Sequence, residues 1–469
     1  MPPPTVPTMR PENALRWSND SHWESLGMTP PATGEEVSIP GGVWMILDAD
    51  PPRLTRLYIY GALEVEDTAD RTVEAELVLI QGGSLIVGRQ DEPFTHKFDL
   101  VLAGNHRTTD QPMYDAPNCG AKALCVYGTS ARDTPVPGFI DMHGVSSGSS
   151  WVRLASTAQP GDTEIELTEE VGWEVGSEVV LSPTSWEYKE TEVGVVAGVA
   201  GTTLTLASPL QFTHRAEQAT LTGQAWQFSQ TASVGLLSRS VRIIGKSYAD
   251  QAEEMFGARV LVGAFDKLGT ILPGYGRFSN VEFQRAGQEG WPDNYDPRYS
   301  LAFVGAGDTE DGAGAPAAAE SYVRNCSFNY NYNSAIGVFG TNNVGVQHNV
   351  LYRFELHLLD GRRTCCSIAM VSTLNQVSIL LCFHFISLVE SCSVKLKIAK
   401  PGTVELTYFT RIGFQLSVRL DFMSFQICRI TFQCAFITRY PMFFSVDASD
   451  VPPNIVWTFK QISALLTRY

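Results

Sequence analysis

The chain has 469 residues, a formal net charge of −16 at pH 7 and 44% hydrophobic residues. This length suffices for two or three ordinary domains, or for one long solenoid with a sizeable core. The acidic balance argues against partners such as nucleic acid or an anionic membrane surface, because this field would attract neither.

The chain begins with a proline-rich lead-in over residues 1–16, and this start contains no apolar stretch of the kind found in a secretory signal peptide. Trp17 and Trp23 then flank a polar turn, and strands are expected at 36–39 and 43–47, on either side of a Pro-Gly-Gly turn. We interpret this region as a cap that covers the open end of a solenoid.

A repeat with a period of 22 residues follows the cap. Each copy is a short run of alternating apolar residues with a glycine before a second alternation, which predicts a strand, a tight bend and another strand. Single coils of this kind cannot bury their own apolar face and must stack, so the repeat predicts an all-β fold built as a parallel β-helix. The repeated positions are Leu57, Gly61, Leu63 and Val65, which recur as Leu79, Gly83, Leu85 and Val87.

Short strands that end at glycine continue the pattern at 98–104, 123–128 and 138–144. The insertion at 105–120 is expected to project as a loop, which is where solenoids usually place binding residues. Residues 151–213 contain alternating strands bounded by Gly or Pro, and they predict an inserted antiparallel β module. The solenoid is expected to resume at 234–245.

Later coils at 278–283, 323–328 and 346–352 place Asn280, Asn325 and Asn349 at equivalent corners. A side-chain amide at such a corner hydrogen-bonds the backbone of its own turn and the next coil, so it satisfies groups that would otherwise be buried without a partner. We therefore interpret these asparagines as structural.

At this point the residues resemble a known family. The motifs HWE, VSIPGG, LYIYGALEV, QGGSLIVG, IDMHG and WVRLA resemble the eight-glycine (G8) domain of the fibrocystins and of the hyaluronan-degrading cell-migration-inducing and transmembrane proteins. The segment from 213 through the asparagine corners resembles the parallel β-helix that follows this domain in the same proteins. The resemblance covers about 17–353 and implies a right-handed, pectin-lyase-like solenoid. The expected domains are the G8 domain at 17–150, the inserted module at 151–213 and the β-helix at 214–353.

One similarity within the family and one departure from it matter for function. The amino-acid sequence of residues 287–290 and 295–300 is most similar to that of the fibrocystin-L branch. Where the hyaluronan-degrading relatives have a His-Phe-His element, this chain has Ser300-Leu301-Ala302-Phe303. The imidazoles that act as acid or base or that hold a metal are therefore missing, and the degrading activity is not carried over.

The end of the chain differs in composition from the rest. Residues before 354 contain 37 of the 40 glycines, whereas six of the nine cysteines follow. We interpret 354–469 as an unrelated tail, such as translated intron, and a genuine all-β or membrane-associated tail is the alternative. The apolar run at 377–389 is too short to span a bilayer, so no membrane span is expected in this chain.

The best candidates for catalysis are Asp293, Asp296 and Arg298 on one loop, with Glu289 and His214 as further members. Enzymes that cleave polysaccharides commonly pair carboxylates, and some hold calcium, the one cofactor this enzyme alternative would involve. The competing interpretation is that the two aspartates are turn residues that pair with the arginine.

Other candidate residues point to binding or structure. Trp291, Tyr295 and Tyr299 on the same loop either stack on sugar rings or pack on the solenoid flank. No metal site or resident cofactor is expected, because His22 and His143 have no Cys or His partner at ligand spacing.

Two covalent features are expected if the chain lies in an oxidising, extracellular compartment. Cys119 and Cys125 are close enough in sequence to close a small loop by a disulfide. Asn19 begins an Asn-Asp-Ser glycosylation sequon.

The resemblance to the fibrocystin-L branch implies a non-catalytic, receptor-like segment of a larger extracellular or cell-surface membrane protein. Its expected partner is a glycan or an extracellular protein, bound through the loops of the β-helix. A polysaccharide-degrading enzyme, acting on hyaluronan or a related chain, is the alternative.

Overall fold

The computed structural model describes the backbone of residues 10–358 and 361–371 and of five strands between 392 and 447, with gaps at 132–133, 186, 221–226, 268, 291–294 and 309–320. Side chains are described as far as Tyr352. The chain divides into two units, Met1–Phe383 and His384–Tyr469.

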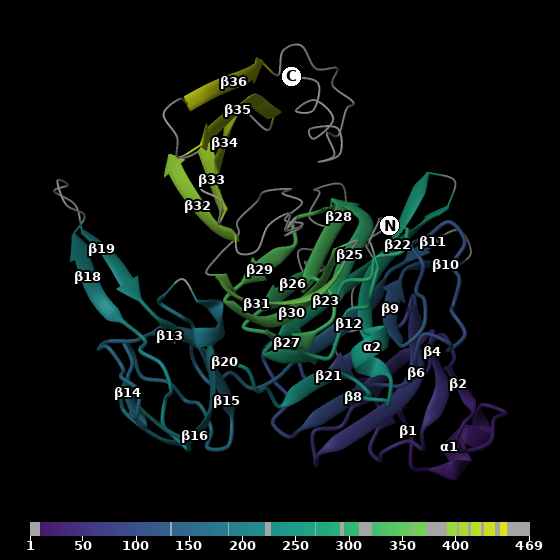
Figure 1. The fold of residues 1–469 in the computed structure, drawn as a ribbon. Coiled ribbons are helices and arrows are strands. Elements are labelled where there is room, and N and C mark those ends of the chain that lie inside the picture. Colours follow the sequence, from purple (N-terminus) through teal and green to yellow (C-terminus); the bar gives the residue numbers. More distant parts are fainter. Residues whose placement is uncertain are drawn as a thin grey trace. The chain divides into compact units, whose positions relative to one another are not determined.

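The first unit is a stack of parallel strands arranged in three sheets (Figure 1). Sheet A contains eight short parallel strands that pair in chain order. They are β1 (Leu15–Arg16), β3 (Trp44–Leu47), β5 (Ala62–Val65), β7 (Ser84–Val87), β12 (Gly138–His143), β23 (Thr270–Ser279), β26 (Tyr322–Arg324) and β29 (Gly345–Gln347).

The other two sheets arise from a common start formed by β2 (Glu36–Ile39), β4 (Leu54–Ile59) and β6 (Arg71–Gln81). β6 is long enough for its two halves to pair with different strands, β8 and β9. Sheet B1 continues through β8 (Phe98–Leu102), β21 (Val241–Gly245), β24 (Val281–Gln284), β27 (Ser327–Asn331) and β30 (Asn349–Leu358). Sheet B2 continues through β9 (Ala123–Tyr127), β22 (Arg259–Lys267), β25 (Leu301–Asp308) and β28 (Ile336–Asn342).

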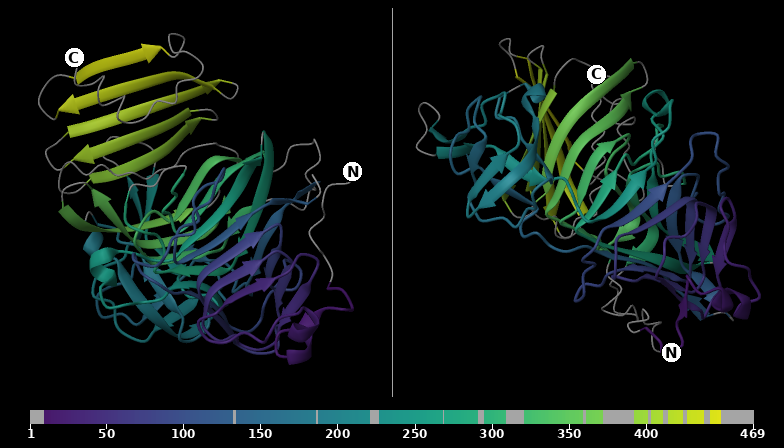
Figure 2. Two further views of the ribbon diagram at one scale, coloured as in Figure 1. Left: turned by 90° about the vertical axis from the view of Figure 1, so that its right-hand side faces the viewer. Right: turned by 90° about the horizontal axis from the view of Figure 1, so that it is seen from below.

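From β21 onward the chain visits B1, B2 and A in turn, and each new strand pairs in parallel with the strand one coil earlier. This is a parallel β-helix, as predicted, and both views of Figure 2 show its strands running side by side. The inward side chains of all three sheets form one apolar core that extends from Trp17 to Ala335. Stacking of coils therefore buries what a single coil would leave exposed.

The repeated glycines lie where one coil passes directly over another. A Cβ added at Gly83 would lie 2.4 Å from the Gly61 carbonyl oxygen and 2.5 Å from that of Ile59. A Cβ added at Gly61 would lie 2.2 Å from the Val43 carbonyl oxygen. These positions require glycine because the backbone of the preceding coil occupies the space of a side chain.

The predicted pairing of Leu57 with Leu79 is wrong by one residue. Leu57 is opposite Val78, whereas Leu63 is opposite Leu85 as the 22-residue period requires. The turn after β6 holds one additional residue, Gly82, in the left-handed region with φ of 67°. Because side chains alternate along a strand, this shift turns Leu79 to the outer face, while Leu57 points into the core.

The cap contains a helix where the sequence suggested only a turn. α1 (Asp20–Ser25) begins at Asn19, whose side chain accepts a hydrogen bond from the Ser21 backbone N–H. The Trp23 indole donates to the Trp17 carbonyl at 2.7 Å, and the two rings pack edge to face. Both tryptophans are buried and cover the first coil.

The inserted module is an antiparallel sheet that extends beyond the expected 213. It contains β13 (Trp151–Arg153), β14 (Glu164–Glu166), β15 (Glu178–Leu181), β16 (Glu192–Ala200), β17 (Thr203–Leu206) and β20 (Ser233–Leu236). Because β20 pairs with both β13 and β15, the residues at 234–236 belong to the module, and the solenoid resumes at β21 instead. A hairpin of β18 (Ala216–Thr220) and β19 (Gln227–Thr231) precedes β20.

The asparagine corners are present, with one member displaced. Asn280 and Asn325 follow strands of sheet A and have φ of 55° and 53°, but the equivalent residue of the next coil is His348, with φ of 52°. Asn349 lies one residue later and bridges two coils. Its side chain accepts from the Cys326 N–H and donates to the Val323 carbonyl, both at 2.9 Å.

Two shorter elements connect strands of the solenoid: the hairpin of β10 (Thr129–Ala131) and β11 (Thr134–Val136), and α2 (Gln251–Glu254). The 3-10 helix η1 (Tyr188–Glu190) lies within the inserted module, between β15 and β16. After β30, β31 (Gly361–Val371) pairs antiparallel with it. The second unit is an antiparallel meander of β32 (Cys392–Lys400), β33 (Thr403–Thr410), β34 (Phe414–Met423), β35 (Gln426–Phe436) and β36 (Pro441–Asp447). Among the residues described, no helix is long and apolar enough to cross a membrane. That 354–469 is unrelated to the family stays a prediction.

Candidate functional site

Two loops cover the outer face of sheet B2 and form a second apolar layer there. The loop between β8 and β9 contributes Met113, Ala116 and Cys119, which pack on outward side chains such as Leu79 and Leu261. Cys119 and Cys125 form a disulfide that ties the end of this loop to β9. The insertion at 105–120 is therefore fixed to the solenoid and does not project freely.

Arg259 joins this loop to the one that carries Asp296. Its guanidinium donates to the carbonyls of Asn118 and Cys119, both at 2.6 Å, and to the Asp296 carboxylate at 2.7 Å. Arg298 donates to the other Asp296 oxygen at 2.8 Å and to the Glu289 carbonyl at 2.7 Å. Arg259 is only 2% exposed, whereas the side chains of Asp296 and Arg298 are 26% and 36% exposed, so the network extends from a buried cation to the surface.

The network assigns Asp296 a structural part. Burial alone would raise the pKa of its carboxyl group, but the Arg259 and Arg298 guanidiniums outweigh burial and hold the pKa below its usual value. A carboxylate clamped between two guanidiniums is a poor general acid, because it does not carry the proton that a leaving group needs. The arrangement therefore favours the turn-and-pairing interpretation of Asp296 and Arg298 over a catalytic one.

The remaining catalytic candidates do not gather around Asp296. His214 is buried in the core of the inserted module, where its ring nitrogens lie 2.9 Å from the Ser182 carbonyl and 3.0 Å from the Glu192 carboxylate. Glu289 enters the network only through its backbone carbonyl. Asp293 lies outside the described residues. The structure thus brings together Asp296 and Arg298 and leaves His214 in another sheet.

The aromatic candidates on the same loop separate into two kinds. Tyr299 is buried against Phe339 in the apolar layer on sheet B2, so of the two interpretations the packing one describes it. Tyr295 is 62% exposed, and its backbone carbonyl accepts from the Asn118 N–H. Trp291 lies outside the described residues.

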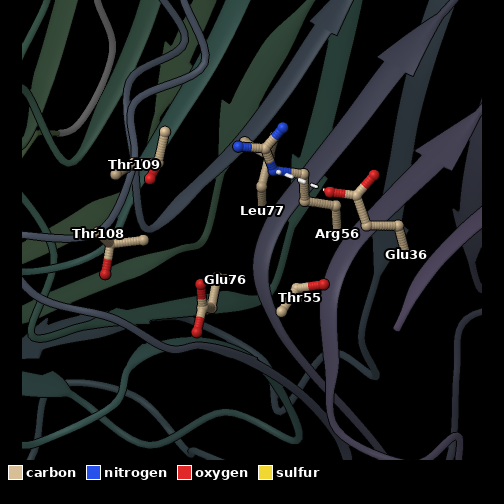
Figure 3. Close-up of a pocket in the computed structure, with 8 residues that line it drawn as sticks. Glu36, Thr55, Arg56, Glu76, Leu77, Thr108 and Thr109 are labelled. Carbon is tan, nitrogen blue, oxygen red and sulfur yellow. Dashed lines mark ion pairs between the residues drawn. The ribbon is translucent and has the colours of Figure 1, made fainter. Parts of the chain in front are cut away.

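A polar pocket of about 210 Å³ lies beside this covered face, at the start of the solenoid. Its floor is one register row on the outer face of three strands, with Glu36 on β2, Arg56 on β4 and Leu77 on β6. Figure 3 shows the Arg56 guanidinium between Leu77 and Glu36, and Thr108 and Thr109 across the pocket on the loop between β8 and β9. Thr55, Glu76 and Ala121 complete the wall.

Arg56 is held in place by three groups. Its Nη1 donates to the Tyr58 hydroxyl and to the Gln111 amide oxygen, both at 3.2 Å, and its Nε lies 3.6 Å from the Glu36 carboxylate. The Glu76 carboxylate accepts a hydrogen bond from Arg53 at 3.1 Å. The pocket therefore presents two carboxylates, a cation held by three groups and three threonine hydroxyls.

Two stacked tyrosines follow Arg56 along the same strand, and the first of them, Tyr58, contacts the Arg56 guanidinium. Tyr58 and Tyr60 stack with ring centroids 6.4 Å apart and an interplanar angle of 10°, and Tyr60 is 41% exposed. We call the pocket and the two tyrosines the tyrosine-pocket site. Sequence reasoning missed this site because its residues come from three coils and one long loop, with no local spacing that marks them. The signal available was the alternation of outward polar residues in the strands.

The histidines expected to be structural have partners in the fold. His22 accepts a hydrogen bond from the Arg16 backbone N–H at 2.7 Å. His143 is buried, and its Nε2 lies 2.8 Å from the Tyr322 hydroxyl. Within the described ranges, no group of three or more His, Cys, Asp or Glu residues is arranged to hold a metal ion. Asn19 is exposed and caps α1, and its glycosylation stays a prediction.

Comparisons with known families agree with the two parts of the solenoid. Residues 17–155 match the G8 domain, and residues 269–359 match the CEMIP beta-helix. These matches confirm the resemblance drawn from the sequence motifs. The first match ends five residues beyond the expected boundary at 150.

Individual relatives include fibrocystin-L proteins from two species. Fibrocystin-L of Mus musculus is 37% identical over 362 residues, which are 74% of this chain and 8% of that relative. Fibrocystin-L of Homo sapiens is 36% identical over the same shares. This chain therefore spans less than a tenth of the length of either relative. Among solved structures, the Pseudomonas phage phi297 tailspike gp61 is 12% identical to this chain, with a TM-score of 0.18. The aligned region covers 61% of this chain and 43% of the tailspike chain. Nothing is concluded from a TM-score this low.

Proposed function

Because this chain is a fibrocystin-L-like protein with a G8 domain and a CEMIP beta-helix region, we propose that it is a non-catalytic binding segment of an extracellular, receptor-like protein. We propose further that its ligand is a neutral glycan and that the glycan binds at the tyrosine-pocket site. One observation carries this proposal: a stacked, partly exposed tyrosine pair adjoins Arg56, which lines a pocket of hydrogen-bonding groups.

The chemistry of the site fits a sugar ring. The C–H face of a pyranose packs on an aromatic ring, and its hydroxyls bind side chains that are already held in place. Arg56 supplies donors, while Glu36 and Glu76 supply acceptors for hydroxyl groups. Two carboxylates beside the pocket disfavour an anionic sugar, because like charges at this distance repel.

The competing enzyme function has less support. The loop that carries Asp296 uses its carboxylate to join Arg259 and Arg298, and these guanidiniums hold the pKa of the carboxyl group below its usual value, which suits a general acid poorly. A protein ligand is the other alternative for the same surface.

A glycan array probed with the purified chain tests the proposal, followed by titration of a glycan that binds. Tyr60→Ala should weaken binding roughly two- to tenfold, since an aromatic contact contributes about 0.5–1.5 kcal/mol. Val175→Ser, at an exposed position of the inserted module, is the matched control and should leave affinity unchanged.

Either of two results would overturn the proposal. The first is a folded chain that binds no glycan, or that binds equally well after Tyr60→Ala. The second is shortening of hyaluronan or another polysaccharide by the chain, measured by size separation, which would make the segment an enzyme.

A further inference from the structure

The loop between β8 and β9 contacts residues 246–256, which we call the α2 segment, as well as lining the tyrosine-pocket site. Thr108 and Thr109 form one wall of the pocket (Figure 3), whereas His106, two residues earlier, faces α2. At the other end of the loop, Ala121 lines the pocket, while Lys122 donates hydrogen bonds to the backbone on either side of α2. At both ends, therefore, pocket-lining residues lie within two residues of a contact with the α2 segment.

The residues around His106 form one hydrogen-bonded turn. The Thr108 N–H donates to the Asn105 carbonyl at 3.0 Å, and the Thr108 hydroxyl accepts from the Asn105 N–H at the same distance. The Arg107 N–H donates to the Asn105 side-chain oxygen at 2.9 Å. Because His106 and Thr108 belong to the same turn, a contact that holds the imidazole also holds the wall of the pocket.

An ion pair joins this turn to α2. His106 Nδ1 lies 2.7 Å from the carboxylate of Glu254, the last residue of the helix. The hydrogen bond from the imidazole holds the pKa of the Glu254 carboxyl group below its usual value. The two side chains are 45% and 21% exposed, so the pair lies at the surface and responds to the pH of the solvent.

The α2 segment is itself attached to the solenoid. Lys122 Nζ donates to the Lys246 carbonyl at 2.7 Å and to the Phe256 carbonyl at 3.2 Å, at the two ends of the segment. The centroid of the Tyr248 ring lies 4.8 Å from the same nitrogen, and Gln251 within the helix is only 4% exposed. A wall that is joined to this segment is therefore joined to the solenoid.

Given the proposed function of the tyrosine-pocket site, on which this inference rests, we propose that His106 and Glu254 are positioning residues of that site and that their ion pair adds to glycan affinity at acidic pH. A contact between histidine and a carboxylate is an ion pair only while the imidazole is protonated, and histidine changes its charge between pH 8 and pH 5. At acidic pH the pair fixes the wall before the ligand arrives, so binding loses less conformational entropy.

Other charged groups face the same carboxylate. Arg107 and the Tyr248 hydroxyl also lower the pKa of Glu254. Lys122 faces it from the end of the loop, and burial, together with Arg285 from the next coil, lowers the Lys122 pKa to about 7, while Glu254 acts in the opposite direction. Lys122 therefore titrates in the same pH range as histidine. Because the lysine is the same in every variant below, differences between variants at one pH report the ion pair.

Hydrogen exchange of residues 105–111 in the full chain, measured by mass spectrometry at pH 5.5 and pH 7.5, tests the attachment without a ligand. At pH 5.5, Glu254→Gln should accelerate exchange about two- to fivefold relative to the unsubstituted chain, which is the range for a partly exposed ion pair, and the factor should be smaller at pH 7.5. Glu253→Gln, at the exposed neighbouring position, is the matched control and should leave exchange unchanged.

His106→Arg provides the rescue. Arginine keeps its charge at both pH values, so this variant should protect residues 105–111 as well as the unsubstituted chain does at pH 5.5, and better than it does at pH 7.5. The proposal is overturned if the folded Glu254→Gln chain exchanges like the unsubstituted chain at pH 5.5. It is also overturned if Glu254→Gln accelerates exchange by the same factor at both pH values, since the contact would then hold the wall without depending on charge.

An array of neutral oligosaccharides, probed with the same proteins at pH 5.5, tests the consequence for binding. Glu254→Gln should weaken the binding of a recognised glycan about two- to fivefold, and Glu253→Gln should not. If a glycan binds and Tyr60→Ala weakens its binding while Glu254→Gln does not, the positioning part assigned to Glu254 is wrong and the proposed function stands. If no neutral oligosaccharide binds the folded chain, the proposed function is wrong and the effect on affinity is refuted with it.

Discussion

Replacing Arg259 tests whether the Asp296 network is structural. Arg259→Met keeps a side chain of similar length but removes the guanidinium, and so leaves the carbonyls of Asn118 and Cys119 and the Asp296 carboxylate without their donor. Gly120 packs directly on this guanidinium, where an added Cβ would lie 2.2 Å from Nη2. The change therefore detaches two loops from the outer face of sheet B2.

The expected cost follows from burial and from the number of bonds lost. Breaking a buried ion pair by removing one partner typically costs about 3–5 kcal/mol of unfolding free energy, and each carbonyl left unsatisfied adds to that cost. Arg298 contacts the same carboxylate, but its side chain is 36% exposed. Arg298→Gln should therefore cost less than about 1 kcal/mol.

Urea unfolding followed by circular dichroism measures both losses, with the disulfide kept oxidised in every sample. Asp296→Asn should also destabilise the chain, because it leaves the buried Arg259 charge without its counterion. The structural interpretation is refuted if Arg259→Met costs less than about 1 kcal/mol, or if Asp296→Asn abolishes a polysaccharide-degrading activity while stability is unchanged.

The same carboxylate gives a pH dependence with a defined sign. The pKa of Asp296 is lower in the folded state than in the unfolded chain, so its contribution to stability is present above the unfolded pKa of about 3.9. The contribution is lost as the pH falls through the lower, folded pKa. The free energy of unfolding of Asp296→Asn should therefore be lower than that of the unsubstituted chain at neutral pH. Below about pH 4 it should also decrease less steeply as the pH falls.

Three further outcomes are expected. Gly83→Ala should cost about 1–3 kcal/mol in urea unfolding, because its Cβ meets backbone carbonyls of the preceding coil, while Gly41→Ala, whose nearest neighbour lies at 3.8 Å, should be almost neutral. Burial lowers the pKa of Lys122 to about 7, so the unfolded chain binds more protons between pH 7 and about 10 and stability should rise with pH there; Lys122→Met should flatten that slope. Asn349→Ala should cost about 1–3 kcal/mol, because the buried Cys326 N–H loses its acceptor, and hydrogen exchange at that amide should accelerate.

Much of the solenoid could be predicted from the sequence because its constraints are local. The strands at 36–39, 98–102 and 123–127 lie where alternation placed them, since outward and inward side chains meet different surroundings in every coil. The register in which neighbouring strands pair was harder to predict. One residue inserted at Gly82 moved Leu79 to the outer face, and sequence spacing alone does not show whether a turn contains two residues or three.

The corner asparagines show the same limit. Asn349 was expected to take the left-handed corner position of Asn280 and Asn325, but His348 takes that position, and the Asn349 amide bridges the coils instead. Asn331, on another corner, accepts from the Ala286 N–H at 2.8 Å in the same manner. The residue types indicated that side-chain amides are needed at the corners. Only the fold shows which residue adopts the left-handed backbone conformation and which one forms hydrogen bonds between coils.

The binding residues were less predictable because their exposure depends on which strands are covered by loops from distant parts of the sequence. Tyr295 and Tyr299 are four residues apart and similar in sequence context, yet one is exposed and the other lies beneath a loop that begins almost 200 residues earlier. Glu36, Arg56 and Thr108 come together only through the register of β2 with β4 and the return of the loop after β8. No spacing in the sequence encodes either result.

The inserted module is held to the solenoid by polar groups that have no other way to be satisfied. Arg239, on the segment that returns from the module, is buried, and burial lowers its pKa to about 10. Its guanidinium donates to the carbonyls of Leu236 and Ser238 and to that of Asn325 at a coil corner, while its backbone N–H donates to the buried Glu282 carboxylate. Swinging the module away would strip partners from a buried cation and a buried carboxylate together, which costs several kcal/mol.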